Sequence, residues 1–173
     1  MVGYICFKSS DISVLELAAG HGDLALVFLT AVTARGGTIT TYDFVDNIFK
    51  HFDKARNWLI GYPVCYRILN AENDLESQGF TPNAYEVVLA SDVGSLAHAS
   101  GLIRRIGVLI FVLKSNINDN WRAVLLDSCP GFDIQLTFLD ITDGSLVVIS
   151  RNDDAVSSHF PPHVRVLTNL APE

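Results

Sequence analysis

The chain alternates between short, uninterrupted apolar runs and longer segments whose apolar residues recur at helical spacing. Runs rich in Val, Ile, Leu and aromatic residues are typical of buried strands. Such strands are expected at residues 13–18, 38–44, 64–69, 85–90 and 108–113. Apolar positions three or four residues apart predict helices between them, at residues 24–34, 47–59 and 96–105. An alternation of strands and helices favours a parallel sheet that helices cover on both faces.

The pattern changes towards the end of the chain. A helix is expected at residues 119–128, followed by strands at residues 132–138 and 145–150. The Asp143-Gly144 pair between these strands is a hairpin signal, so the strands should run antiparallel. Alternating β/α units closed by such a hairpin are typical of the seven-stranded, Rossmann-like sheet of methyltransferases, with helices on both faces. We therefore expect one α/β domain over residues 1–150 and a loosely ordered tail over residues 151–173.

Composition narrows the class of protein. Of the 173 residues, 49% are hydrophobic and 18% are charged, which argues against disorder and fits a single domain. The net charge of −7, with only 12 Lys and Arg residues, disfavours a nucleic-acid partner. No apolar run approaches the roughly 20 residues of a membrane span, and no signal peptide is expected. Three widely spaced cysteines fit neither a disulfide framework nor a metal site, so we expect a cytoplasmic protein with reduced thiols.

The turn after the first expected strand, residues 16–22, is a candidate ligand site. Its glycines allow a ligand to approach the backbone closely, and Asp43 or Asp46 near the end of the second strand could accept hydrogen bonds from a ribose. Asp23 stands where the N-terminus of the next helix would receive a pyrophosphate, and its charge disfavours NAD and nucleoside triphosphates. A cationic cofactor without phosphates, such as S-adenosyl-L-methionine (SAM), is compatible with Glu16 and Asp23.

Four blocks of sequence resemble the C-methyltransferase domain of fungal highly reducing polyketide synthases. They are VLELAAGHGDLAL, TTYDFVDNIFKHFDKA, YRILNAENDLESQGFTPNAYEVVLASDV and WRAVLLDSCPGFDIQLTFLD, which together lie within residues 13–150. The third block is the most specific, because its Gln-Gly-Phe and its Tyr-acid-Val-Val-x-Ala-Ser strand are not general features of methyltransferases. The resemblance implies a SAM site, with Asp46 at the ribose and Asn70 and Ala71 beside the adenine. The full set of implied cofactor-binding residues is Glu16, Ala18, Gly20, Gly22, Asp46, Asn70, Ala71 and Ser91.

The chain departs from the family pattern at the cofactor turn. The family motif begins Glu-x-Gly-x-Gly-x-Gly-Gly, whereas here Ala18 replaces the first glycine and Asp23 replaces the last. The methyl group of Ala18 is unfavourable only if the site needs a positive φ at that position. Asn70 replaces the usual Asp, which keeps an acceptor and removes a charge.

The catalytic region departs further. In the family a His acts as general base on the α-carbon of a β-keto thioester, and a Glu after the fifth strand orients it. Ser95 stands at the His position and no Glu ends the fifth expected strand. A serine without an activating partner cannot serve as such a base. His98, three residues later, is the candidate catalytic residue. Few residues precede the first expected strand, so the helical lobe that would cover the cofactor is expected to be missing.

These observations leave two functional hypotheses. The first is a SAM-dependent methyltransferase-like protein of polyketide biosynthesis with weak or lost catalysis, acting with a polyketide synthase or on a carrier-bound β-ketoacyl substrate. The second is a non-catalytic pseudo-methyltransferase that serves as a structural or interaction module of a polyketide synthase. A hydrolase triad of Asp92, Ser95 and His98 is disfavoured, because the chain has no G-x-S-x-G turn and the three residues lie on one short segment.

Overall fold

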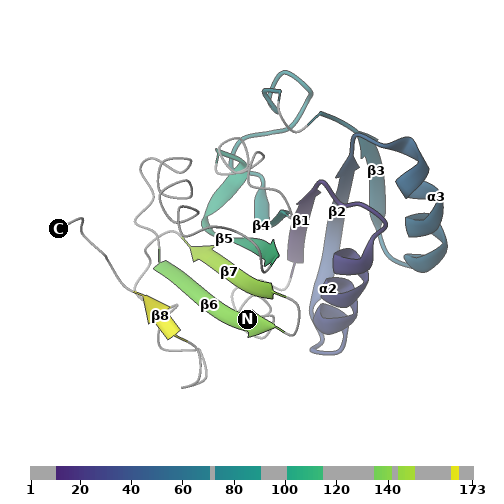
Figure 1. The fold of residues 1–173 in the computed structure, drawn as a ribbon. Helices are drawn as coiled ribbons and strands as arrows, with labels where there is room; N and C mark the ends of the chain where they lie inside the picture. The colour runs from purple at the N-terminus through teal and green to yellow at the C-terminus, as the bar shows by residue number, and fades with distance from the viewer. Residues whose placement is uncertain are drawn as a thin grey trace.

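A computed structural model describes residues 11–70, 73–90, 101–114, 135–141, 144–150 and 165–167. Its strands form one sheet in the order β3-β2-β1-β4-β5-β7-β6-β8 (Figure 1). The strands are β1 (Asp11–Leu17), β2 (Thr38–Asp46), β3 (Val64–Ile68), β4 (Tyr85–Ala90), β5 (Ile103–Lys114), β6 (Gln135–Ile141), β7 (Gly144–Ser150) and β8 (Arg165–Leu167). The helices are α2 (Asp23–Thr33) and α3 (Phe49–Trp58).

The first five strands pair in parallel, and α2 and α3 connect β1 to β2 and β2 to β3. This part of the molecule confirms the expected α/β architecture. At the other end of the sheet, β7 pairs antiparallel with both β5 and β6. The described residues place eight strands in the sheet where seven were expected, because Arg165–Leu167 pairs with β6. Residues 142–143, in the expected hairpin turn, and most of the expected tail lie outside the described residues.

The prediction of a helix at residues 96–105 is wrong for its last residues. Ile103 begins β5 and pairs in register with Tyr85, and the pairing shifts before Val87 meets Val108. Ile103 pairs with β4 and therefore belongs to a strand, although the spacing of the apolar residues in this stretch resembles that of a helix. Residues 91–100 and the expected helix at residues 119–128 lie outside the described residues.

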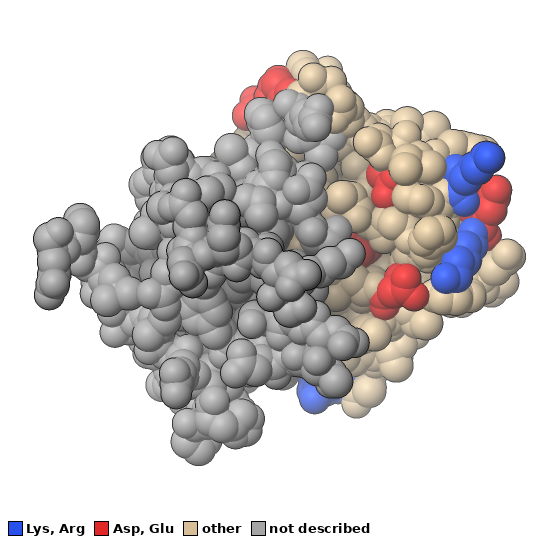
Figure 2. Space-filling model, in the orientation of Figure 1, with Lys and Arg blue, Asp and Glu red and all other residues tan. Residues whose placement is uncertain are grey.

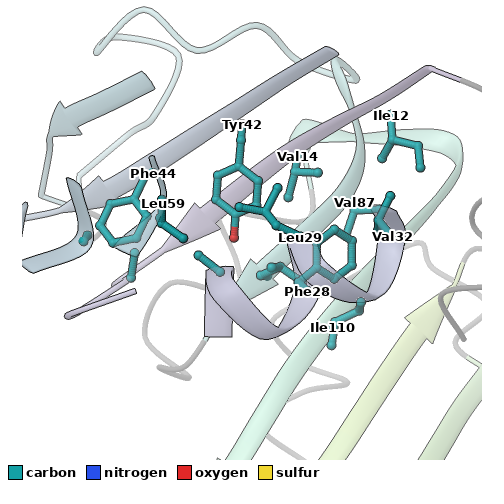
Figure 3. Close-up of a cluster of buried hydrophobic side chains, with 14 of the residues drawn as sticks. Ile12, Val14, Phe28, Leu29, Val32, Tyr42, Phe44, Leu59, Val87 and Ile110 are labelled. Carbon is teal, nitrogen blue, oxygen red and sulfur yellow. The ribbon is translucent and has the colours of Figure 1, made fainter. Parts of the chain in front are cut away.

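Helix α2 buries one apolar face against the sheet. Its buried residues Ala25, Phe28, Leu29 and Val32 are three or four positions apart, as expected for an amphipathic helix. They join one core cluster with Phe52 and Ala55 of α3 and with residues of β1, β2, β4 and β5 (Figure 3). Figure 3 shows Tyr42 of β2 inside this cluster, between Phe44 and Val14. Both helices therefore cover the same face of the sheet.

Strand residues that point to the opposite face are buried as well. Leu15, Val45, Val88 and Leu109 each have no exposed surface. Every residue of β4 is buried. The central strands are therefore covered on both faces, which is the reason for their uninterrupted apolar sequences.

Candidate ligand site at the carboxyl ends of the strands

The loop between β1 and α2, residues 18–22, turns three times through left-handed backbone. The φ angles are 53° at Ala18, 59° at Gly20 and 91° at Gly22. At Gly22 the chain also passes close to α3, since a Cβ there would lie 3.2 Å from the Cβ of Ala55. Glycine is thus required at Gly22 by both its backbone and its neighbours. Ala18 occupies the left-handed region with a methyl group, at a cost of roughly 1 kcal/mol or more.

Asp46, at the end of β2, holds this loop in place. Its Oδ2 accepts a hydrogen bond of 2.7 Å from the Gly20 amide, and its Oδ1 accepts one of 2.7 Å from the Ile48 amide. The Nδ1 of His51 lies 3.1 Å from the same Oδ1, and the His51 ring packs against that of His21 with centroids 4.5 Å apart. The side chain of Asp46 is therefore buried beside the glycine loop, at the position expected of a ribose-binding acid.

The other acid that the sequence offered for this role lies elsewhere. Asp43 accepts a hydrogen bond from the hydroxyl of Tyr85, and its Oδ2 lies 3.9 Å from Nη1 of Arg67. Neither of these partners belongs to the loop. The structure thus separates two acids that are three positions apart on one strand, and only Asp46 contacts the candidate site.

Glu16, near the end of β1, is the second buried acid at the loop. Its side chain accepts a 2.6 Å hydrogen bond from the hydroxyl of Tyr42, and only 2% of the residue is exposed. Burial raises the pKa of Glu16 to about 8; the bond from Tyr42 opposes this shift, and the charges of Asp46 and Asp23 add to it. Burial and the neighbouring Glu16 also raise the pKa of Tyr42. The raised pKa favours the protonated form of the Glu16 carboxyl group at neutral pH.

Tyr42 is the functional candidate that the sequence did not reveal. An aromatic residue in a strand is usually part of the core, and Tyr42 is indeed fully buried. Its proximity to Glu16 becomes apparent only from the pairing of β1 with β2. Val14 is the register partner of Tyr42, and Glu16 lies two residues further along β1 on the same face.

The end of β3 lies beside the end of β2. The Leu69 amide donates a 3.1 Å hydrogen bond to the carbonyl of Asp46, and Ile68 is the register partner of Asp46. The next residue, Asn70, uses its carbonyl to accept a 3.2 Å bond from Nε2 of Gln78. Ile68 and Ile48 are 63% and 46% exposed, so the register partner of Asp46 and the residue two positions after it both present apolar side chains at the surface.

The structure brings together five of the expected cofactor residues. They are Glu16, Ala18, Gly20, Gly22 and Asp46, with Asn70 at the end of the neighbouring strand. Ala71, Ser91 and the candidate base His98 lie outside the described residues, as do Asp92 and Ser95. The described site is therefore the half expected to hold a cofactor.

The surface around the described elements carries mixed charge. Figure 2 shows basic side chains mainly on the side of the molecule that carries α3, with acidic side chains beside them. Among the described residues, no group of three or more His, Cys, Asp and Glu side chains could hold a metal ion. None of the helices in the described part of the chain is long and apolar enough to cross a membrane.

Comparison with curated proteins finds relatives among polyketide synthases. The chain is 43% identical over 171 residues to highly reducing polyketide synthase 17 of Metarhizium anisopliae, a match that covers 99% of the chain. It is 30% identical over 145 residues, or 76% of the chain, to highly reducing polyketide synthase AFT9-1 of Alternaria alternata. The matched segments make up only 6% and 5% of these synthases. No protein-family model matches the chain.

Solved structures with a similar fold include methyltransferases. The trans-methyltransferase CalH, crystallised in complex with SAH, superposes with a TM-score of 0.61 at 25% identity, covering 76% of this chain and 39% of CalH. The CurJ carbon methyltransferase gives a TM-score of 0.63 at 19% identity, covering 83% of this chain and 49% of CurJ. The chain therefore belongs to the family of fungal highly reducing polyketide synthases, of which it matches a segment, and it has the fold of polyketide synthase carbon-methyltransferase domains.

Proposed function

We propose that the chain binds S-adenosyl-L-methionine at the loop of residues 18–22 as a methyltransferase-like part of a polyketide synthase system, with weak or lost methyl transfer. The observation that carries this proposal is the pair of buried acids, Glu16 and Asp46, on either side of a loop with three left-handed residues. Loops of this kind allow the backbone to approach a ligand closely. The proposal includes a seven-stranded methyltransferase core, β1 to β7, closed by a hairpin through the Asp143-Gly144 turn, to which β8 adds an eighth strand.

The chemistry of the site fits this cofactor. Each oxygen of Asp46 accepts one backbone hydrogen bond, and Oδ1 also lies 3.1 Å from Nδ1 of His51. Oδ2 keeps a lone pair that a ribose hydroxyl can use. Ile48 and Ile68 offer apolar surface for the adenine, together with Asn70, Ala71 and Ser91. Glu16 and the backbone of the loop would hold the methionine half. When bound, the cofactor supplies an electrophilic methyl group on its sulfonium.

The acceptor in this proposal is the α-carbon of a carrier-bound β-ketoacyl thioester. Removing a proton from such a carbon requires a positioned base with a pKa near the working pH. His98 is the proposed base, and Ser95 stands at the position where the family has its histidine. A base displaced in this way supports slow transfer at most.

A non-catalytic role is the second candidate. Ala18 keeps a methyl group at a φ of 53°, where the family motif has a glycine. A loop that retains this strain is not optimised for its ligand, which favours a pseudo-methyltransferase that serves as a structural or interaction module of a polyketide synthase.

Calorimetric titration with SAM and with S-adenosylhomocysteine tests cofactor binding. We expect saturable binding that weakens about tenfold or more in Asp46→Asn, because a charged acceptor is lost. Asp53→Asn is the matched control, since Asp53 lies on α3 with 71% of its side chain exposed. Absence of heat at millimolar cofactor, with a protein that unfolds cooperatively, would refute the proposal.

Methylation of a β-ketoacyl thioester then separates the two candidates. Turnover that His98→Ala abolishes supports the enzyme, provided that the variant still binds the cofactor. Cofactor binding without turnover over many hours supports the non-catalytic module.

A further inference from the structure

Three carboxyl groups surround the glycine loop. Glu16 lies at its start, Asp46 is hydrogen-bonded to Gly20 inside it, and Asp23 follows it in the first turn of α2. The charges of Asp46 and Asp23 both act on Glu16. Among the described residues, Asp46 has a histidine partner, whereas Glu16 and Asp23 form no ion pair. The loop therefore offers negative charge without a resident Lys or Arg.

Tyr42 fixes the position of Glu16 within this group. Its hydroxyl lies 2.6 Å from Oε2 of Glu16, and Tyr42 has no exposed surface. The parallel pairing of β1 with β2 sets the spacing of the two side chains, so their contact does not depend on the loop. A tyrosine hydroxyl can donate to a carboxylate or to the carbonyl oxygen of a carboxylic acid. The pair can therefore persist whether or not Glu16 carries its proton.

We propose that Glu16, positioned by Tyr42, selects the cofactor by its charge, because it releases one proton when a cationic ligand enters and not when a neutral one does. This inference rests on the proposed function. SAM carries a sulfonium and an ammonium against one carboxylate, whereas S-adenosylhomocysteine has lost the sulfonium charge. In the step, the O–H bond of the Glu16 carboxyl group breaks, its proton passes to the solvent, and the resulting carboxylate faces the bound cation.

The consequence is a pH-dependent preference for the methyl donor over its product. The pKa of Glu16 is about 8 in the free protein, so below that pH the affinity for SAM should rise with pH. The rise should approach tenfold per pH unit for one linked proton, and the affinity should level off above pH 8. The affinity for S-adenosylhomocysteine should change much less over the same range.

Other titratable groups lie near Glu16, and their contributions to the pH dependence must be distinguished from that of Glu16. They are Tyr42 and Asp46 of β2, Asp23 of α2, His51 of α3 and His21 of the loop. Of the two histidines, His51 lies 3.1 Å from Oδ1 of Asp46, and the His21 ring packs against that of His51. The variant Glu16→Gln keeps them all in place and removes only the proposed proton.

Calorimetry in buffers with different ionisation enthalpies counts the protons released on binding. Near pH 6.5 we expect close to one proton released with SAM and close to none with S-adenosylhomocysteine. In Glu16→Gln the release with SAM should disappear, and its affinity should become nearly independent of pH.

The variant Tyr42→Phe tests the positioning role. Loss of its hydrogen bond should make Glu16 hold its proton more tightly, so the rise in SAM affinity should move to higher pH, with affinity at pH 7 about tenfold weaker. Tyr85→Phe is the matched control, because it removes a hydroxyl from the other buried tyrosine–carboxylate pair. It should leave both the proton count and the pH profile unchanged.

The outcomes distinguish this inference from the proposed function. SAM binding without proton release, or with equal release in Glu16→Gln, overturns the role of Glu16 while the proposed function stands. An equal effect of Tyr42→Phe and Tyr85→Phe on the pH profile overturns the role of Tyr42. Failure of both ligands to bind at any pH overturns the proposed function itself.

Discussion

Two buried tyrosine–carboxylate pairs lie on this sheet, and they differ in what surrounds them. In the first, Tyr42 donates to Glu16 at the glycine loop. In the second, Tyr85 donates to Asp43, which also lies 3.9 Å from Nη1 of Arg67. Among the described residues, the charges that raise the pKa of Glu16 in the first pair are those of Asp46 and Asp23, whereas the second pair has a guanidinium group beside it. Two similar contacts therefore have opposite electrostatic surroundings.

The surroundings of Arg67 show that the second pair is part of the framework. Its guanidinium carbon lies 3.9 Å from the centroid of the Phe80 ring, and its Nη2 donates a 3.3 Å hydrogen bond to the carbonyl of Gln78. These contacts connect β3 to the segment before β4. A buried carboxylate with a cation and a hydrogen-bond donor is satisfied within the fold, whereas one without a cation is neutralised by its own proton or by the charge of a ligand.

The largest expected effect on stability comes from removing the carboxylate of the Tyr85–Asp43 pair. In Asp43→Ala the hydroxyl of Tyr85 and the guanidinium of Arg67 both lose a partner, so the free energy of unfolding should fall by about 3–4 kcal/mol. Urea unfolding measures this change. Asp53→Ala, on the surface of α3, should change the same quantity by less than about 0.5 kcal/mol. A loss below about 1 kcal/mol for Asp43→Ala would show that the pair does not support the fold.

The next effect is the pH dependence of stability that arises from Glu16 in the Tyr42–Glu16 pair. The carboxyl group of Glu16 keeps its proton up to about pH 8 in the folded chain and loses it near pH 4.5 when unfolded. Ionisation between these values therefore destabilises the fold, by up to about 1.4 kcal/mol per pH unit. The contribution of Glu16 to the free energy of unfolding is fully present below pH 4.5 and is completely lost above pH 8.

Comparison with Glu16→Gln isolates that contribution. Between pH 5 and pH 8, urea unfolding should show that the wild type loses about 3 kcal/mol relative to the variant. The other acids titrate in both proteins, so their effects cancel in the difference. Parallel curves for the two proteins would mean that Glu16 is ionised in the folded state at neutral pH.

The smallest expected effect concerns the backbone beside Glu16. Ala18 has a φ of 53°, so Ala18→Gly should remove strain and raise the free energy of unfolding by roughly 0.5–1 kcal/mol. The same change within α2, Ala31→Gly, should lower it by about 1 kcal/mol, because glycine is a poor helix former. Opposite signs for the two variants in thermal or urea unfolding are the expected result; a loss in both would mean that Ala18 is not strained.

Much of the arrangement of the candidate site could be predicted from the sequence. The positions of the glycine turn, Glu16 and Asp46 follow from the succession of a strand, a turn and a second strand along the chain. Hydrophobic periodicity reveals this succession without knowledge of tertiary contacts. The helix expected at residues 96–105 failed where pairing with β4 extended β5 back to Ile103. Helical spacing and a short apolar strand look alike until a partner strand is present.

The sequence by itself determined that a parallel sheet with buried central strands carries an acidic, glycine-bearing turn, because burial and left-handed backbone leave local marks on residue type. Only the tertiary structure decided which acid meets which tyrosine, that Asp46 and not Asp43 reaches the loop, and that Ala18 is strained. Those contacts join strands that are far apart in the chain. Their electrostatic consequences depend on strand register and burial, which exist only after the sheet has formed.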